Sequence, residues 1–323
     1  MIKLSNIATY FASCTMVVWG QQDFTAPPAY SATNTSVSPV IAVIGDTQRT
    51  SALERLLLFR EQNEIEREHL VTNMLARNFE ILVHLGDMVF DGSSEQEWQY
   101  FDSLFAPLRS PPRRTLIALG NHEYWGNNQR AMRNVTARFP ELIISHWRDY
   151  IFHSVALLVI DSNVSEYTEA EWHNQVIWFE NRLQELDQDE QVHAIVVFSH
   201  HPPFSNNTVT GEATHVQQDF LPAFFDTRKT VAFISGHAHG YERFAIRDKT
   251  FIVSGGGGGP RFQMLTEADS RHQDLYGGPQ PRPFNYLLLA LEENDMRVSV
   301  MGLHKGQDQV KLIEEFSVNY PTN

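Results

Sequence analysis

The amino-acid sequence predicts an α/β fold, and three observations support the prediction. Short apolar runs typical of buried strands recur along the chain, and segments with helical periodicity lie between several of them. Several runs end in glycine followed by a carboxylate or an imidazole, at the position where open α/β sheets place their functional residues. Apolar residues make up 42% of the 323 residues, which is enough for a packed core.

The N-terminal residues 1–20 are expected to form a signal peptide. Lys3 supplies a positive charge, and residues 7–19 form a mostly apolar stretch too short to span a bilayer. Val18 and Gly20 suit the −3 and −1 positions of a cleavage site. A buried N-terminal helix is the alternative. We therefore expect export to the periplasm or the exterior, with no stable membrane span after processing.

The chain's one cysteine, Cys14, lies in this segment. The small residues before it resemble a lipoprotein signal, although Phe11 replaces the usual leucine, so a lipid anchor at Cys14 is the alternative to cleavage. Cleavage after Gly20 would leave no cysteine and hence no disulfide. Residues 21–39, rich in Ala, Pro, Ser and Thr, are expected to form a flexible tether.

Residues 40–323 are expected to form one domain, because no linker or internal repeat divides them. The first strand is predicted at 40–44. A helix with a break follows, from the capping box of Ser51 and Glu54 to about residue 78. The apolar face of its first part is expected to consist of Leu53, Leu56 and Leu57.

Further helices are predicted at 95–107 and after Thr168, which forms a capping box with Glu171. The segments 147–153 and 155–161 are expected to form a hairpin. The remaining strands are predicted at 81–85, 115–119, 193–199, 231–235, 241–247, 250–254, 285–291 and 296–302.

Five strand ends carry side chains that can bind metal ions. They are Asp46 with Gln48, Asp87, Asn121 with His122, His200, and His237 with His239. Oxygen and imidazole donors without a thiolate suit Zn, Fe or Mn. Residues two apart in an extended chain point the same way, so His237 and His239 could face two ions about 3.5–4 Å apart. Asp87 is the expected central, bridging carboxylate.

Each of these residues also has a simpler interpretation. Asp46 and Asp87 could be turn residues, and His237 or His239 could be a surface histidine. The glycines at 255–259 could cradle a phosphate, but no helix start follows them, which favours a flexible or tight loop. The complete set favours a metal site, because every member follows an apolar run.

The motifs resemble those of calcineurin-like metallophosphoesterases, and the resemblance covers about residues 40–302. It rests on Gly45-Asp46, Gly86-Asp87, Gly120-Asn121-His122-Glu123, His200 and Gly236-His237-Ala238-His239. The similarity is greatest to the purple acid phosphatase branch, because of the tail Gly240-Tyr241-Glu242-Arg243 and the His-x-Pro form at 200–202. The resemblance implies a four-layer α/β/β/α sandwich with two mixed sheets and a dinuclear centre at the carboxyl ends of the strands.

The resemblance also implies individual roles. The first ion would be bound by Asp46, Asp87 and His239, and the second by Asp87, Asn121, His200 and His237. His122 would be the acid near the leaving group, and Glu123 would orient it. Gln48 replaces the family's His or Gly and is kept as a metal ligand, whereas Phe90 replaces the tyrosine of the purple enzymes. An Fe(III)–tyrosinate centre is therefore not expected, and the ions are expected to be two divalent ions of Fe, Mn or Zn.

The resemblance implies a hydrolase for small phosphorylated substrates, and the charge of the chain limits the other partners. The chain has 25 Lys and Arg against 39 Asp and Glu, a net charge of −14, which disfavours nucleic acid as a partner. Two divalent ions would still make the site positive and would activate a bound hydroxide for attack on phosphorus. We expect a phosphomonoesterase. A phosphodiesterase of the cyclic nucleotide or phospholipid headgroup type, or an inactive ligand-binding relative, is the alternative. The loops 202–215 and 260–284, with His215 and Arg261, are expected to shape substrate choice.

Overall fold

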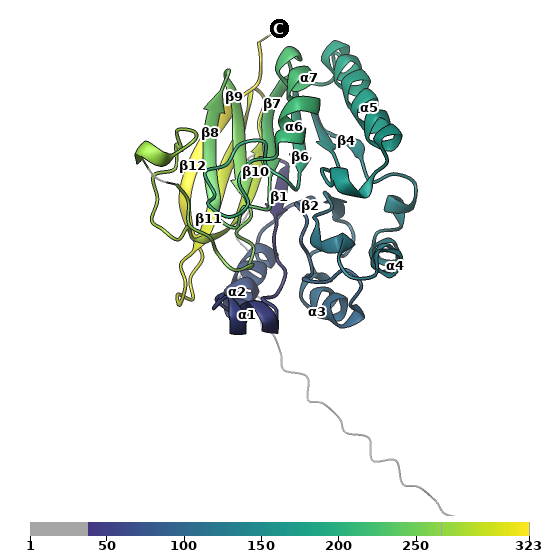
Figure 1. Cartoon of the computed structure of the whole chain (residues 1–323). Coiled ribbons are helices and arrows are strands. Elements are labelled where there is room, and N and C mark those ends of the chain that lie inside the picture. Colours follow the sequence, from purple (N-terminus) through teal and green to yellow (C-terminus); the bar gives the residue numbers. More distant parts are fainter. Residues whose placement is uncertain (1–37, 266, 323) are drawn as a thin grey trace, which may run out of the picture. The chain divides into compact units, whose positions relative to one another are not determined.

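The computed structural model describes residues 38–265 and 267–322, and its strands form two six-stranded mixed sheets (Figure 1). The predicted signal peptide and the predicted tether up to residue 37 lie outside the described residues. In β1 (Val40–Ile44) alternate side chains face opposite sides, and both sides are buried. Ile41 and Val43 belong to the central core between the sheets, and Ala42 and Ile44 belong to an outer core. Such burial on both faces explains the continuous apolar runs in the sequence.

The first sheet has the order β12-β11-β10-β1-β2-β3. Its parallel part is β1, β2 (Ile81–His84) and β3 (Arg114–Ile117), and its antiparallel part is β10 (Phe284–Leu291), β11 (Asp295–Leu303) and β12 (Lys311–Asn319).

The second sheet has the order β4-β5-β6-β7-β9-β8. Its strands are β4 (Arg148–Phe152), β5 (Val155–Val159), β6 (Ala194–Ser199), β7 (Thr230–Ser235), β8 (Tyr241–Ile246) and β9 (Lys249–Ser254). The inner strands are parallel, and the edge strands β4 and β8 are antiparallel to their neighbours.

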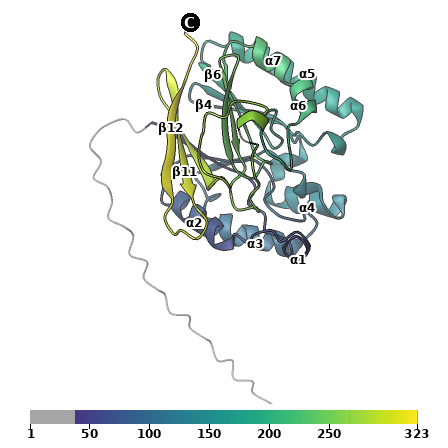
Figure 2. The same ribbon diagram turned by 60° about the vertical axis from the view of Figure 1, so that its left-hand side comes forward.

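Helices cover the outer face of each sheet, which completes four layers (Figures 1 and 2). Leu70, Trp98 and Val135 bring three helices onto the first sheet. These helices are α2 (Glu64–Leu75), α3 (Glu95–Phe105) and α4 (Asn128–Arg138). The helices on the second sheet are α5 (Glu169–Gln188), α6 (Thr214–Asp219) and α7 (Leu221–Asp226). Short 3-10 helices lie at η1 (His122–Tyr124), η2 (Pro140–Ile143), η3 (Val164–Glu166) and η4 (Glu267–Asp269). The predicted four-layer α/β/β/α sandwich is confirmed.

The predicted helix with a break is confirmed as α1 and α2, but the apolar face of its first part is not part of the core. The capping box of Ser51 is present and starts α1 (Ala52–Leu57), but this helix buries no residue. Its predicted apolar face, Leu53, Leu56 and Leu57, is about two-thirds exposed. The helix ends after six residues, and the core positions are filled by α2 instead. Among the described residues, no helix is long and apolar enough to cross a membrane.

Candidate metal centre

The carboxyl ends of β1, β2, β3, β6 and β7 bring the predicted ligands together in two groups. In the first group, one ligand atom each from Asp46, Asp87 and His239 lie within 4.8 Å of one another. In the second, His200, His201 and His237 meet the same limit. Asn121 joins the second group, because its Oδ1 lies 3.2 Å from Nε2 of His200. The structure thus brings Asp46, Asp87 and His239 together in one group and Asn121, His200 and His237 in the other, where His201 is an addition.

The carboxylate of Asp87 lies between the two groups. Its Oδ1 is 3.4 Å from Nε2 of His200, and its Oδ2 accepts a hydrogen bond of 3.2 Å from Nε2 of Gln48. The same Gln48 nitrogen is 3.2 Å from Nε2 of His239. This is the arrangement that a bridging carboxylate requires, with one oxygen for each group.

Backbone carbonyls orient two of the imidazoles. Nδ1 of His200 lies 2.7 Å from the carbonyl of Leu85, and Nδ1 of His239 lies 2.7 Å from the carbonyl of Pro260. Such a contact places the proton on Nδ1 and leaves Nε2 free as a ligand. Nε2 of His200 lies near Asp87, and Nε2 of His239 lies near Asp46.

Three predicted ligands have left-handed backbone conformations. The φ angles are +58° at Asp46, +54° at Asp87 and +65° at His237. For a residue with a side chain, this conformation costs roughly 1–2 kcal/mol, and strain of this kind concentrates at functional sites. The extended geometry expected at His237 and His239 is therefore wrong, although the two rings still face different groups.

Two glycines allow the carboxylates to approach the backbone closely. A Cβ at Gly120 would lie 2.2 Å from Oδ1 of Asp87, and a Cβ at Gly236 would lie 2.5 Å from Oδ2 of Asp46. Both distances are well below contact distance. Glycine at these two motif positions is thus required by packing around the predicted ligands.

The carboxylate of Asp87 and the imidazole of His200 stabilise each other's charged forms. Burial alone would raise the pKa of Asp87, but the charges of His200 and His122 hold it well below its usual value. Burial would lower the pKa of His200, whereas the Asp87 carboxylate raises it to about 10. Nδ1 of His237 also lies only 3.0 Å from Nε2 of His200, which brings two potential ligand nitrogens together.

An oxygen without a hydrogen-bond partner is a further indication of a metal ion at this site. Oε1 of Gln48 is buried and has no hydrogen-bond partner in the described part of the chain. A buried acceptor without a partner is costly, and a metal ion in this position would satisfy it. The donor set and this oxygen therefore fit divalent metal ions.

His122 lies beside the groups, and the predicted role of Glu123 needs correction. Nδ1 of His122 is 2.6 Å from the carbonyl of Phe90, which orients the ring. Glu123 instead accepts hydrogen bonds from the backbone amides of Asp87, Met88 and Gly120, at 2.7–2.8 Å. These contacts hold the turn that carries Asp87. The 3-10 helix η1 turns consecutive side chains in different directions, which explains why neighbours in sequence act on different partners.

The end of β5 contributes residues that the sequence analysis missed. Oγ of Ser162 lies 2.8 Å from Nδ1 of His201, and it also accepts from the His201 backbone amide at 2.9 Å. The buried Asp161 accepts hydrogen bonds from the hydroxyls of Tyr124 and Tyr167. The apolar run at 155–160 ends in Asp-Ser-Asn, the same signal that identified the other strand ends.

The remaining predicted features make contacts within the fold, and the expected role of His215 and Arg261 in substrate choice stays a prediction. The glycines at 255–259 form a tight loop, in which a Cβ at Gly257 would lie 2.2 Å from the carbonyl of Gly45. Arg261 is held by Glu61, with an Nε–Oε1 distance of 2.7 Å. Nε2 of His215 lies 2.9 Å from the carbonyl of Ser162, so this residue supports the β5 end.

Glu242, in the last motif, leads to a prediction for stability. Burial raises its pKa from 4.5 to about 7, against the opposing hydrogen bonds from Ser205 and Asn206. A raised carboxyl pKa means that stability falls as the pH rises from the unfolded value of 4.5 to about 7. Glutamine has no carboxyl group to ionise, so Glu242→Gln should not lose this stability. Its free energy of unfolding relative to that of wild type should therefore rise by at most about 3 kcal/mol between the two pH values.

Urea unfolding of the metal-free proteins at pH 5 and pH 8 measures this difference. The exposed Glu293 provides the matched control, Glu293→Gln. An equal pH dependence for wild type and Glu242→Gln would contradict the prediction.

Comparisons with known proteins agree with this geometry. The family model described as calcineurin-like phosphoesterase matches residues 39–241. No curated protein matches the chain.

Solved structures share the fold. GAP50 of Plasmodium has a TM-score of 0.65 at 14% identity, with 89% of this chain and 90% of that chain covered. A purple acid phosphatase from yellow lupin has a TM-score of 0.62 at 16% identity, with 88% and 54% covered. A dimetal phosphatase from Danio rerio has a TM-score of 0.60 at 17% identity, with 88% and 100% covered. The family match covers more than half of the chain and includes every predicted ligand, and the chain belongs to the calcineurin-like phosphoesterase family.

Proposed function

We propose that the protein is a phosphomonoesterase that requires two divalent ions of Fe, Mn or Zn. The observation that carries the proposal is the pair of buried donor groups with Asp87 between them. The proposed ligands are Asp46, Gln48, Asp87 and His239 for the first ion, and Asp87, Asn121, His200 and His237 for the second. When bound, such ions supply positive charge for phosphoryl oxygens and lower the pKa of bound water.

His122 is the proposed proton donor. Nδ1 of its ring contacts the Phe90 carbonyl, and Nε2 lies 3.8 Å from Oδ2 of Asp87. Trp125 stacks on the same ring with a centroid distance of 3.6 Å, which restricts its rotation. An imidazole held in this way can deliver a proton from Nε2 to the oxygen of a departing alcohol.

Two other functions are possible for a chain with this fold. A phosphodiesterase would use the same donor groups, and substrate preference alone separates it from the monoesterase. A metal-free binding protein of this fold is the other alternative, since GAP50 is described as an anchor in the inner membrane complex. The retained donor set supports the enzyme, because a binding protein has no need of seven metal-type donors on five strand ends.

A substrate panel combined with elemental analysis tests the proposal. The metal-loaded chain is expected to contain two ions and to hydrolyse phosphomonoesters faster than diesters. One ion or none after loading would refute the dinuclear centre. Faster hydrolysis of cyclic nucleotides or phospholipid headgroups would establish the diesterase alternative.

The iron-loaded protein is expected to lack the purple colour of tyrosinate centres. Phe90 has no phenol, and the two tyrosines nearest to the motifs have other partners. The hydroxyl of Tyr124 donates to Asp161, and that of Tyr241 donates to Glu314 at 2.6 Å. Visible absorption of the oxidised, iron-loaded chain is the measurement. A strong band in the green to yellow region would contradict this prediction, and Phe90→Tyr tests whether the position can support one.

We also propose that the protein is exported, on the basis of the pattern in residues 1–20. Mass analysis of the mature protein is expected to show Gln21 as the first residue. A lipid-modified Cys14 at the mature N-terminus would support the lipoprotein alternative.

A further inference from the structure

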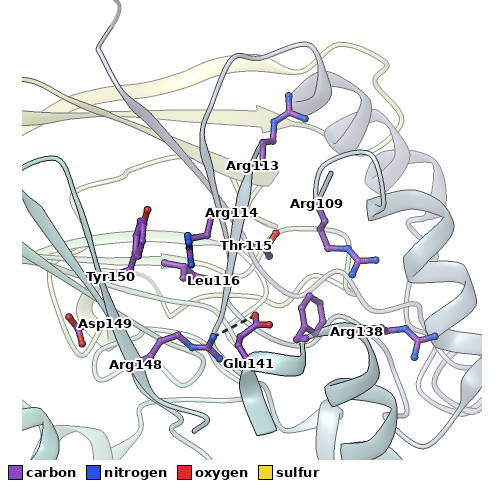
Figure 3. A pocket seen from close by; sticks show the side chains of 11 residues that line it. Arg109, Arg113, Arg114, Thr115, Leu116, Arg138, Glu141, Arg148, Asp149 and Tyr150 are labelled. Carbon is purple, nitrogen blue, oxygen red and sulfur yellow. Dashed lines mark ion pairs between the residues drawn. The ribbon is translucent and has the colours of Figure 1, made fainter. Parts of the chain in front are cut away.

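A cavity of about 380 Å³ lies between the edge strands of the two sheets (Figure 3). The strands β3 and β4 each end their sheet, and both contribute lining residues. No residue of this cavity is a predicted metal ligand. Five arginines line it, against only two carboxylates, Glu141 and Asp149. The arginines are Arg109, Arg113, Arg114, Arg138 and Arg148.

Two of the five arginines are neutralised by carboxylates outside the lining. Arg109 binds one oxygen of Asp102 at 2.6 Å, and Arg138 binds the other at 2.8 Å. Arg138 also pairs with Glu95 at 2.9 Å. The ion pairs account for the charges of these two side chains, which form the wall of the cavity nearest to α3 and α4.

The other three arginines have little compensation. The guanidinium of Arg114 stacks on the Tyr150 ring, 4.4 Å from its centroid, and that of Arg113 lies over Phe79. Neither makes an ion pair within the described residues. Arg148 has one ion pair, a long contact of 3.5 Å with Glu141.

The second carboxylate of the lining, Asp149, pairs with an arginine outside the cavity. Asp149 is bound by Arg182 at 2.9 Å. The cavity therefore holds an excess of positive charge within a chain whose net charge is −14.

Arg148 is the clearest sign of a missing partner. Its Nε and Nη2 are buried and donate no hydrogen bond to any part of the chain that the structure describes. Burial lowers the pKa of Arg148, Glu141 raises it, and the charge of Arg114 lowers it, with a net shift below its usual value. An unsatisfied buried donor costs about 1–3 kcal/mol, and more when it is charged. Arginine guanidinium groups without a close carboxylate partner are side chains that bind phosphate-type oxyanions.

We propose that this cavity is a second anion site, which binds a phosphate-type anion through Arg148 and Arg114. The ligand class is inorganic phosphate, pyrophosphate or the phosphoryl group of a small molecule. The proposal is independent of the hydrolytic function, since no lining residue belongs to the metal centre. A purely protective role for charged side chains on edge strands is the competing explanation, because such charges prevent edge-to-edge pairing.

Pyrophosphate binding to the full chain tests the proposal, both metal-loaded and after removal of metal with a chelator. Binding to the metal-free chain is expected to be saturable by calorimetry and to raise the melting temperature, as mass action requires. The double variant Arg114→Ala, Arg148→Ala should weaken this binding at least about tenfold, because it removes the charge-assisted hydrogen bonds. Arg148→Lys should retain part of the affinity, since it keeps the positive charge but loses the planar guanidinium that can make two parallel hydrogen bonds.

The exposed Arg297, paired with Glu292, provides the control variant Arg297→Ala, which should bind as wild type does. If the double variant does not fold, arginine modification of the wild-type chain by phenylglyoxal gives the answer. Pyrophosphate should then protect Arg148 and Arg114 and leave Arg297 reactive. Unprotected Arg148, equal binding by the folded double variant, or no saturable binding to the metal-free chain would overturn the proposal in favour of edge protection.

Discussion

Asp87→Asn is expected to abolish phosphoester hydrolysis and to lower the metal content of the loaded chain below two ions. The Asp87 carboxylate lies within reach of both donor groups, through Oδ1 toward His200 and Oδ2 toward Gln48. Asparagine has nearly the same shape but no negative charge, and it offers one oxygen in place of two. One proposed ion therefore loses its bridge, and both lose the charge that attracts them.

Elemental analysis and steady-state kinetics on the same preparation measure both effects. Asp91→Asn is the matched control, since Asp91 follows in the same loop and accepts a hydrogen bond from the Ser93 amide. That variant should keep two ions and full activity. Two ions and wild-type turnover in Asp87→Asn would show that the bridge has been assigned to the wrong residue.

The sequence predicted the site well where the chemistry lies directly at a strand end. An apolar run buried on both faces has few possible partners other than a central sheet, and parallel strands bring their carboxyl ends to one edge. For this reason Asp46, Asp87, His200 and His239 could each be placed at a strand end from residue order. The arrangement of two sheets that brings these strand ends together was implied only by the resemblance to calcineurin-like metallophosphoesterases. The strands β2, β6 and β7, with their buried side chains, lie within a residue or two of the predicted ranges.

The sequence could not predict contacts that depend on where the backbone turns. Glu123 follows His122 directly, and the prediction gave it the role of orienting that neighbour. In the structure the 3-10 turn sends its carboxylate to three backbone amides, including that of Asp87, a residue far away in the sequence. Left-handed φ angles at Asp46 and His237 are likewise set by the packing of several strand ends.

Periodicity also does not show whether an apolar face has a partner. Leu53 and Leu56 have helical spacing, yet α1 lies outside the core and leaves both exposed. The opposite error occurred at β12, whose sequence has two adjacent glutamates and weak alternation. This strand is held at the sheet edge by antiparallel pairing with the preceding strand β11, and its side chains give little sign of that pairing.

His122→Ala is expected to lower turnover by about 10²–10⁴-fold while the chain keeps both metal ions. The ring lies outside both donor groups, with its Nδ1 on the Phe90 carbonyl and its Nε2 3.8 Å from the Asp87 carboxylate. The loss should depend on the leaving group. Alkyl phosphates need a proton on the departing oxygen, whereas a nitrophenolate departs without one, so nitrophenyl phosphate should lose least.

Metal analysis and a comparison of alkyl and nitrophenyl monoesters separate proton donation from other roles of His122. Trp125→Leu is the positioning control, because it removes the ring that stacks on His122 and leaves the imidazole in place. We expect it to lower turnover less than His122→Ala, with the same order of leaving groups. Loss of metal in His122→Ala would make this histidine a ligand. An equal loss for both leaving groups would assign it to substrate binding, because a proton donor must act most on the substrate that needs the proton.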